Sequence, residues 1–306
     1  MEQLYAHLRE QGVSEDLLSM VTEYREHYGV EESVQDRVIR PEIFFYGKDI
    51  LEMAISALLY KENLLLSGAK ATGKNVLCET LAYLFGRPTY NISFHVNTDS
   101  TSLIGTDTFR NNEVTLRKGP VSLCAEYGGF GIFDEINMAK NDAVSVLHAT
   151  LDHRRTIDIP GYEKIPLHPA TRFIGTMNYG YAGTKALNEA LVSRFLVIDL
   201  PPLEEDTIFF LLKKHFPTGK KEALEQFCGL FLDLQEKAYN GEISSKSLDM
   251  RGLISAIRIS ASGLAPVKAV TMGIVNKSFD AFEKEIIADT VMTRIPKTWT
   301  ADDLFE

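Results

Sequence analysis

The sequence predicts an α/β fold with a parallel central sheet, followed by a small α-helical domain. Three observations predict it. An apolar run at residues 63–67 leads into a glycine-rich loop and then a helical pattern. Further short apolar runs at residues 90–94, 130–134, 172–178 and 195–200 alternate with helical patterns, as in a parallel sheet covered by helices. After Pro201 and Pro202 only helical patterns remain.

The glycine-rich loop, GAKATGKN at residues 68–75, has the spacing of a phosphate-binding loop. Gly68 and Gly73 allow turns in which consecutive N–H groups point at phosphate oxygens, and Lys74 adds a positive charge. The apolar positions of residues 76–85 lie on one helical face, so the loop delivers phosphates to a helix N-terminus. The predicted nucleotide-binding residues are Gly68, Ala69, Lys70, Ala71, Thr72, Gly73, Lys74, Asn75 and Val76.

Asn75 departs from the phosphate-loop pattern. The pattern has Ser or Thr after the lysine, with a hydroxyl that ligates Mg²⁺. The amide oxygen of Asn75 is still a hard ligand, but it belongs to a longer, neutral side chain. Nucleotide binding is therefore a firmer expectation than rapid hydrolysis.

A second strong signal is the run FGIFDE, which ends in Asp134 and Glu135. Two carboxylates at the end of a buried strand predict a magnesium ligand at Asp134 and a general base at Glu135, which polarises the attacking water. The alternative is a solvated strand end. Adjacent acids directly after an apolar run favour the catalytic interpretation.

Asn178 ends the strand predicted at residues 172–178. The carboxyl ends of parallel strands gather ligands, so its amide can position the attacking water. A turn-forming asparagine before Tyr179 and Gly180 is the alternative.

The remaining elements are predicted around this core. Residues 3–10 and 15–27 form two amphipathic helices that serve either as a docking appendage or as a brace for the core. Residues 43–47, IFFYG, form either an adenine-binding patch or ordinary core, and a helix follows at 48–59. Hairpins are expected at 106–118 and 156–167, and a helix capped by Asn137 runs to residue 151. A helix at 186–194 precedes the last strand.

Four helices, at 205–215, 221–239, 247–262 and 267–285, form the predicted lid, with Arg251 in the first turn of the third. Four segments follow from these boundaries: 1–40, an N-terminal helical extension; 41–202, the α/β nucleotide-binding domain; 203–290, the lid; and 291–306, a loosely attached tail.

Composition narrows the class of protein. The formal charge is −10 and the pI is about 5.3, which disfavours binding to a nucleic-acid backbone. No apolar run is long enough to span a membrane and the start lacks signal-peptide character, so we expect a cytoplasmic protein without a membrane partner. Three dispersed cysteines indicate neither a disulfide framework nor a zinc site.

With these motifs in place, residues 40–285 resemble the AAA+ ATPases, P-loop NTPases, and within them the MoxR family. The resemblance rests on the phosphate loop, GGFGIFDEINMAK from Gly128, FIGTMNYG from Phe173, LNEALVSRF from Leu187 and SLDMRGL from Ser247.

The resemblance implies further roles. Asp134 and Glu135 would be the Walker B pair, and Asn178 the sensor of the γ-phosphate. Arg194 would be an arginine finger that reaches the nucleotide of the neighbouring subunit, although by sequence alone a surface ion pair is favoured there. The residues implied for catalysis are Glu135, Asn178, Arg194 and Lys74; for the nucleotide, Tyr46, Gly47 and Arg251 in addition to the loop; and for Mg²⁺, Asn75 and Asp134.

The resemblance also implies an ATPase that uses ATP and Mg²⁺, assembles as a homo-oligomeric ring of six subunits, and remodels a client protein as a chaperone. A partner with a von Willebrand factor A (VWA) domain is implied by the family alone. Two alternatives remain. Asn75 suits a slow or non-hydrolysing nucleotide-dependent switch, and a nucleic-acid-directed motor would show salt-sensitive DNA binding, against which the acidic balance counts.

Overall fold

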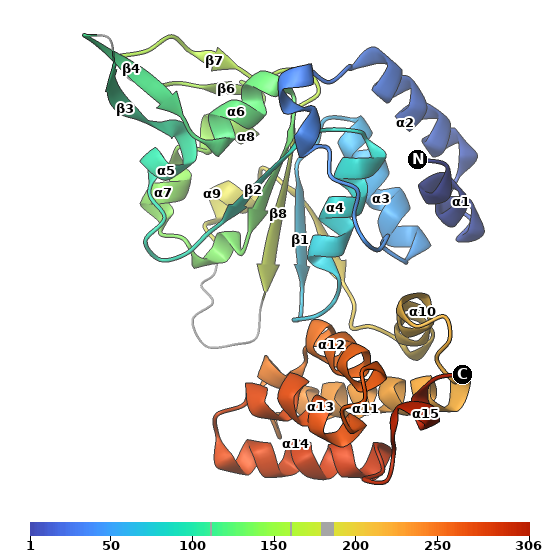
Figure 1. Ribbon diagram of the computed structural model, residues 1–306. Helices are drawn as coiled ribbons and strands as arrows, with labels where there is room; N and C mark the ends of the chain where they lie inside the picture. The colour runs from blue at the N-terminus through green and yellow to red at the C-terminus, as the bar shows by residue number, and fades with distance from the viewer. Residues whose placement is uncertain (111, 160, 179–186) are drawn as a thin grey trace. The chain divides into compact units, whose positions relative to one another are not determined.

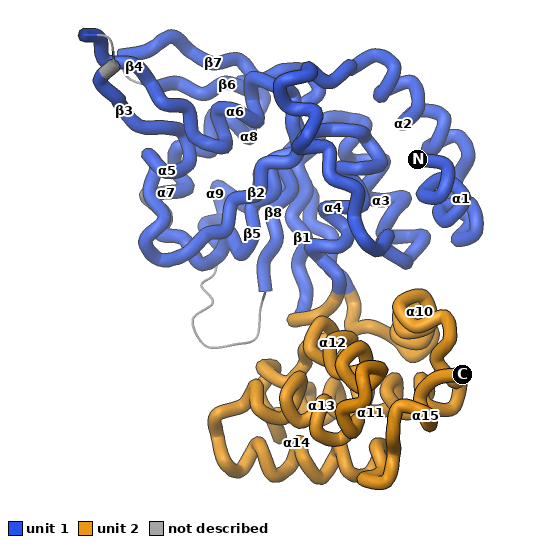
Figure 2. The backbone as a smooth tube through the Cα atoms, in the orientation of Figure 1, with its two compact units in different colours: residues 1–69, 73–200 blue, residues 70–72, 201–306 orange. Residues whose placement is uncertain are grey.

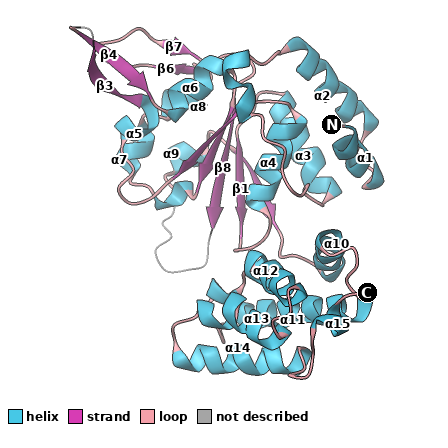
Figure 3. Ribbon diagram, viewed as in Figure 1, coloured by secondary structure: helices cyan, strands magenta, loops and turns pink. Residues whose placement is uncertain are grey.

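The computed structural model describes residues 1–110, 112–159, 161–178 and 187–306. These residues form two compact units, one of residues 1–69 and 73–200 and the other of residues 70–72 and 201–306 (Figure 2). The first unit combines strands and helices, whereas the regular elements of the second are helices (Figure 3).

A five-stranded parallel sheet with the order β2-β5-β8-β1-β9 forms the centre of the first unit (Figure 1). Its register pairs Gly68 with Asn178 and Ser93 with Asp134, so the motifs that follow these strands share the carboxyl edge of the sheet. The predicted α/β class is confirmed. The strands are β1 (Leu64–Gly68), β2 (Thr89–Ser93), β5 (Phe130–Asp134), β8 (Arg172–Asn178) and β9 (Leu196–Leu200).

Both faces of the sheet are covered at its inner strands β1, β5 and β8, which explains why these strands are buried along most of their length. Leu64 and Leu66 of β1 pack in a core with the N-terminal helices, whereas Leu65 packs in a second core on the opposite face. The helices of this unit are α1 (Glu2–Glu10), α2 (Glu15–His27), α3 (Lys48–Leu59), α4 (Lys74–Leu84), α5 (Ser100–Ile104), α6 (Pro120–Tyr127), α7 (Asn141–Ser145), α8 (His148–Leu151) and α9 (Glu189–Val192), with 3₁₀ turns at Glu32–Arg37 and Ile136–Met138.

The N-terminal extension is a brace. Leu4 and Leu8 of α1 and Leu18 and Val21 of α2 are almost fully buried, and all four belong to the core shared with α3 and α4. Burying four such side chains contributes about 6–12 kcal/mol before conformational entropy is subtracted. The extension is therefore an integral part of the first unit.

The predicted helix from Asn137 to Leu151 is wrong as a single helix. The chain forms a 3₁₀ turn, becomes extended at Ala139 and Lys140, and then makes the two short helices α7 and α8. The side chain of Asn137 is buried and donates a hydrogen bond to the carbonyl of Asn178, 2.9 Å away. Asn137 therefore serves a tertiary contact rather than a helix cap.

Both predicted hairpins are confirmed. The first consists of β3 (Gly105–Arg110) and β4 (Glu113–Lys118), with Asn112 in the left-handed conformation that such turns require. The second consists of β6 (Thr156–Ile157) and β7 (Ile165–Pro166). Of the helix predicted at residues 186–194, the structure describes α9, and residue 186 lies outside the described residues.

The second unit differs from the predicted lid in its last helices. The helix expected at residues 267–285 is two helices, because α13 stops at Gly273, and α14 begins after Asp280, whose carboxylate accepts from the Glu283 N–H. The helices are α10 (Glu205–His215), α11 (Lys221–Tyr239), α12 (Met250–Ala261), α13 (Pro266–Gly273), α14 (Ala281–Arg294) and α15 (Ala301–Leu304), with 3₁₀ turns at Ser245–Ser247 and Val275–Lys277.

The expectation of a loosely attached tail is also wrong. The helix α14 runs to Arg294, whose guanidinium donates to both carboxylate oxygens of Asp233 at 2.7 and 2.8 Å. Leu304 is buried in the core of the second unit, and Trp299 packs against it. Apolar residues this close to the C-terminus gain more from burial than the short segment loses in chain entropy.

Candidate functional site

The phosphate loop joins the end of β1 to the start of α4. Gly68 and Gly73 have φ values of 153° and 90°, and Ala71 is left-handed at 64°. These conformations turn the chain sharply before Lys74, where α4 begins without a side-chain cap. The first N–H groups of a helix lack carbonyl partners within that helix, so this end of α4 suits an anionic phosphate.

Lys74 is folded into this loop. Its side chain is buried, and Nζ donates to the carbonyl oxygens of Gly68 at 3.0 Å and Ala69 at 2.7 Å. Burial lowers the pKa of Lys74 to about 8, while the carboxylates of Asp134 and Asp199 oppose that shift. A polyanion bound beside Nζ would favour the charged form of Lys74 and so oppose the effect of burial on its pKa.

The two acids of the DE run occupy different positions at the end of β5. Asp134 ends the strand, and Glu135 follows it in the left-handed conformation, with φ of 53°. A non-glycine residue with positive φ is uncommon and directs its side chain away from the strand's regular alternation. The two adjacent acids thus differ in backbone conformation, Asp134 in the strand and Glu135 in the left-handed residue that follows it.

Thr176 of β8 connects both acids. Its hydroxyl donates to Oδ1 of Asp134 at 2.6 Å and accepts from the backbone N–H of Glu135 at 3.1 Å. Sequence reasoning did not select this residue. The available signal was its position two residues before Asn178, on the same face of the strand.

Asn178 lies beside Glu135. Its side-chain amide donates to Oε1 of Glu135 at 3.2 Å. On β8, Asn178 is the register partner of Gly68 on the adjacent strand β1. The fold therefore brings together the phosphate loop, Asp134, Glu135 and Asn178 at one edge. Tyr179 and Gly180 of the same motif lie outside the described residues.

The residues at this edge fit a magnesium ion. The amide nitrogen of Asn75 lies 3.4 Å from Oδ2 of Asp134, so the two expected ligands are adjacent side chains, and both offer the oxygen atoms that Mg²⁺ prefers. Among the described residues, His, Cys, Asp and Glu side chains form no group of three that could hold a metal alone.

Comparison with known proteins agrees with this geometry. Residues 63–195 match the family model of the AAA domain, dynein-related subfamily. The uncharacterized protein YojN of Bacillus subtilis is 33% identical over 249 residues, covering 80% of this chain and 82% of YojN. The chain belongs with YojN among the AAA+ proteins.

Two other similarities accompany this membership. An uncharacterized protein of Staphylococcus saprophyticus, SSP1341, is 30% identical over 245 residues, covering 78% of this chain and 92% of that protein. The fold is similar to that of a mutant RuvB from Thermotoga maritima, with a TM-score of 0.50, 17% identity, and coverage of 83% of this chain and 73% of that one. At this identity the likeness concerns the fold alone.

In this AAA+ protein Arg194 makes contacts within its own chain. Its Nε donates to the carbonyl of His148 at 3.2 Å, another nitrogen donates to the carbonyl of Ala190, and its charge lies 3.8 Å from Asp152. The side chain is about one-fifth exposed.

The segment before α3 divides into buried and exposed parts. Phe44 and Phe45 are buried in the core, as the packing interpretation predicted, whereas Tyr46 is partly exposed. The Phe45 ring lies against the phosphate loop, because a Cβ on Gly73 would come within 3.2 Å of it. The segment thus adjoins the loop.

Arg251 lies in the other unit of the AAA+ chain. It is exposed in the first turn of α12, as expected from the sequence. Lys70, Ala71 and Thr72 cluster with that unit, and Thr72 is buried.

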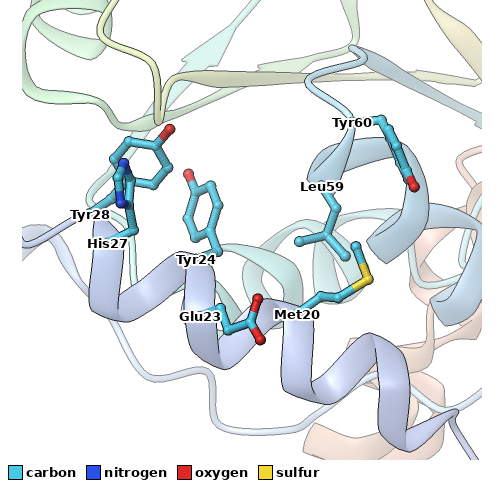
Figure 4. Close-up of a pocket in the computed structure, with 7 residues that line it drawn as sticks. All are labelled: Met20, Glu23, Tyr24, His27, Tyr28, Leu59 and Tyr60. Atoms are coloured by element: carbon cyan, nitrogen blue, oxygen red, sulfur yellow. The ribbon is translucent and has the colours of Figure 1, made fainter.

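A separate groove lies between the ends of α2 and α3 (Figure 4). Tyr24 lines it, and its hydroxyl donates to the carbonyl of Ala170, just before the start of β8, whereas Asn178 ends that strand. The groove is therefore at the opposite end of the strand from the carboxyl-edge site. Its other lining residues are Met20, Glu23, His27, Tyr28, Leu59 and Tyr60.

Among the helices that the structure describes, none has both the length and the apolarity to cross a membrane.

Proposed function

We propose that this AAA+ protein binds ATP with Mg²⁺ and hydrolyses it to ADP and phosphate. The observation that carries the proposal is the grouping of Asp134, Glu135 and Asn178 at the sheet edge that also holds the phosphate loop. Loop, acids and amide lie far apart in the sequence, and their convergence suits phosphoryl transfer to water.

Each residue has a proposed role. The loop's backbone N–H groups and Lys74 bind the phosphates, and Asn75 and Asp134 hold Mg²⁺. The ion, when bound, neutralises charge on the β- and γ-phosphates. Glu135 takes the proton of the attacking water, while Asn178, hydrogen-bonded to Glu135, orients that water.

We infer that the active form is a ring, with six subunits as the expected number. Arg194 would leave its contacts with His148 and Ala190 and approach the γ-phosphate bound by the next subunit. A guanidinium there stabilises the charge of the transition state and makes hydrolysis depend on assembly. Tyr46 and Gly47 would line the adenine, and Arg251 would act as the second sensor.

The test is Mg²⁺-dependent phosphate release measured against protein concentration. Specific activity should rise as the protein assembles and should fall by at least about 100-fold in Glu135→Gln. Arg194→Ala should be inactive alone, yet mixing it with Glu135→Gln should recover part of the activity, since one variant supplies the arginine and the other the intact acid. Activity of Arg194→Ala equal to that of the native protein would refute action across subunits.

We further propose that hydrolysis remodels a client protein, as in MoxR-type chaperones acting with a VWA-domain partner. The hairpin of β3 and β4 supports a protein contact, because Phe109 and Val114 form a cross-strand apolar pair that is 70% and 61% exposed. Replacing both by Ser should leave basal hydrolysis unchanged and abolish stimulation by a candidate VWA-domain protein. Unchanged stimulation would remove the hairpin from that role.

Asn75 favours one second candidate, a nucleotide-dependent switch with slow turnover. The variant Asn75→Thr restores the hydroxyl of the phosphate-loop pattern. Faster turnover and a lower Mg²⁺ requirement in this variant would assign the slow step to Asn75. Tight ATP binding without turnover in the native protein, unaltered by Glu135→Gln, would establish the switch and refute the ATPase.

A further inference from the structure

The N-terminal helix α1 makes polar contacts with the segment that adjoins the phosphate loop. Gln11 is the C-cap residue of α1 and follows His7 by four positions, so its side chain lies near that of His7. The amide oxygen of Gln11 accepts from the backbone N–H of Gly47 at 2.7 Å, and its amide nitrogen donates to the carbonyl of Phe45 at 3.3 Å.

His7 completes this connection. It is buried, and its Nε2 lies 3.0 Å from the Phe45 carbonyl oxygen and 2.8 Å from the Gln11 amide nitrogen. The carbonyl of Phe45 is thus held by His7 of α1 and by Gln11 at its C-cap, and the N–H of Gly47 is held by Gln11. In Figure 1 the helices α1 and α2 lie beside α3, which Gly47 precedes.

The same segment is also fixed from the side of the phosphate loop. The N–H of Phe45 donates to the hydroxyl of Thr80 on α4 at 2.9 Å, and the Phe45 ring lies against Gly73. Residues 45–47 therefore bridge α1 and the start of α4. A displacement of this segment would change the surface beside the loop.

The backbone conformation of Gly47 depends on the residues that contact it. Its φ of 145° is a conformation that other residues rarely adopt, and a Cβ there would approach the Phe45 ring to 3.0 Å. Two backbone hydrogen bonds hold this conformation: the Gly47 N–H donates to Gln11, and the Gly47 carbonyl accepts from the Leu51 N–H at 3.0 Å.

We propose that Gln11, supported by His7, positions residues 45–47 to form the base-side wall of the nucleotide site. This inference rests on the proposed function, since it assumes that the loop binds the phosphates of ATP and that Tyr46 and Gly47 line the adenine. Gln11 is a positioning residue: its hydrogen bonds reach Gly47 and Phe45, and it acts on the site through them. It should therefore affect recognition of the nucleoside and leave recognition of the phosphate chain unchanged.

The test compares two ligands, ATP and inorganic tripolyphosphate, by calorimetry on the full chain. Gln11→Met keeps the size of the side chain but lacks both hydrogen-bonding groups, and it should weaken ATP binding about tenfold. Its affinity for tripolyphosphate should stay within about twofold of the native value. Gln11→Glu keeps an acceptor for the Gly47 N–H and should lose less ATP affinity than Gln11→Met.

The controls separate this role from others. Arg9→Gln changes an exposed residue of the same helix, which pairs with Glu15, and should alter neither affinity. Lys74→Ala should weaken the binding of both ATP and tripolyphosphate. The inference would be overturned if Gln11→Met lost affinity equally for ATP and tripolyphosphate, or lost affinity for neither. A native protein that binds ATP no better than tripolyphosphate would overturn it too, whereas a native protein that binds neither would refute the proposed function and the inference together.

Discussion

The side-chain amide of Asn178 donates a 3.2 Å hydrogen bond to Oε1 of Glu135, although the two residues lie 43 positions apart in the sequence. The contact exists because β8 and β5 are neighbours in a parallel sheet and both residues lie at its carboxyl edge. A water held by this pair would have both a proton acceptor and an orienting donor.

Asn178→Ala should therefore lower the turnover number while leaving ATP affinity nearly unchanged. We expect a loss of about 10- to 100-fold, because positioning of the water is lost while Glu135 remains. Single-turnover phosphate release, with ATP affinity measured separately by calorimetry, checks this. A variant that loses ATP affinity in proportion to turnover would show that Asn178 binds the ground state instead.

Thr176→Val should impair hydrolysis through Asp134 and Glu135. The methyl group replaces a hydroxyl that bonds to both residues, so the carboxylate of Asp134 loses its 2.6 Å donor. We expect turnover to fall about tenfold and the Mg²⁺ concentration for half-maximal activity to rise. Thr176→Ser retains the hydroxyl and should recover most of the activity. If Thr176→Val kept native turnover while Thr176→Ser lost it, the methyl packing rather than the hydroxyl would be responsible.

Arg87→Met should destabilise the first unit by about 3 kcal/mol. The Arg87 side chain is buried, and its guanidinium donates to the carbonyls of Gly128, Tyr127, Tyr28 and Gly29 at 2.7 to 3.0 Å. Methionine would leave these acceptors without their donor. Urea unfolding measures the change, and Arg9→Gln, at an exposed pair, should cost less than about 1 kcal/mol. A similar loss in both variants would contradict the buried role.

Tyr24 should make the free energy of unfolding fall as the pH rises above 10. Burial raises the pKa of Tyr24 from 10 to about 12, so between these values the unfolded chain loses its phenolic proton first. The stabilisation is complete below pH 10 and is lost as the pH rises toward 12.

The matched variant is Tyr24→Phe, which cannot ionise and lacks the hydrogen bond to Ala170. The native protein should exceed it in unfolding free energy by about 1 kcal/mol at neutral pH, and this difference should shrink above pH 10. Urea unfolding at about pH 8 and about pH 10.5 measures it. A difference that stays constant with pH would mean that Tyr24 ionises equally in both states.

Local signals in the sequence were sufficient for much of the fold. The phosphate loop, the strand before Asp134, both hairpins and the two N-terminal helices are specified within short windows by glycines, apolar periodicity and turn residues. These are short-range effects of backbone freedom and side-chain burial, and they act the same way in most contexts. The α/β class could be predicted for that reason.

Long-range contacts decided what local patterns could not. Asn137 resembles a helix cap in sequence but donates to the carbonyl of Asn178, and Thr176 resembles an ordinary strand residue but bonds to both Asp134 and Glu135. The C-terminal segment is predicted to be a loosely attached tail, yet Leu304 is buried in the core of the second unit.

The sequence by itself thus determined the phosphate loop, the acidic strand end and the order of the elements, because each depends on residues adjacent in the chain. The tertiary structure alone decided which distant groups meet: Gln11 with Gly47, Thr176 with Asp134, and Asn178 with Glu135. The physical reason is that a hydrogen bond forms only between groups brought within about 3 Å, and strand order and helix packing, rather than sequence spacing, set those distances.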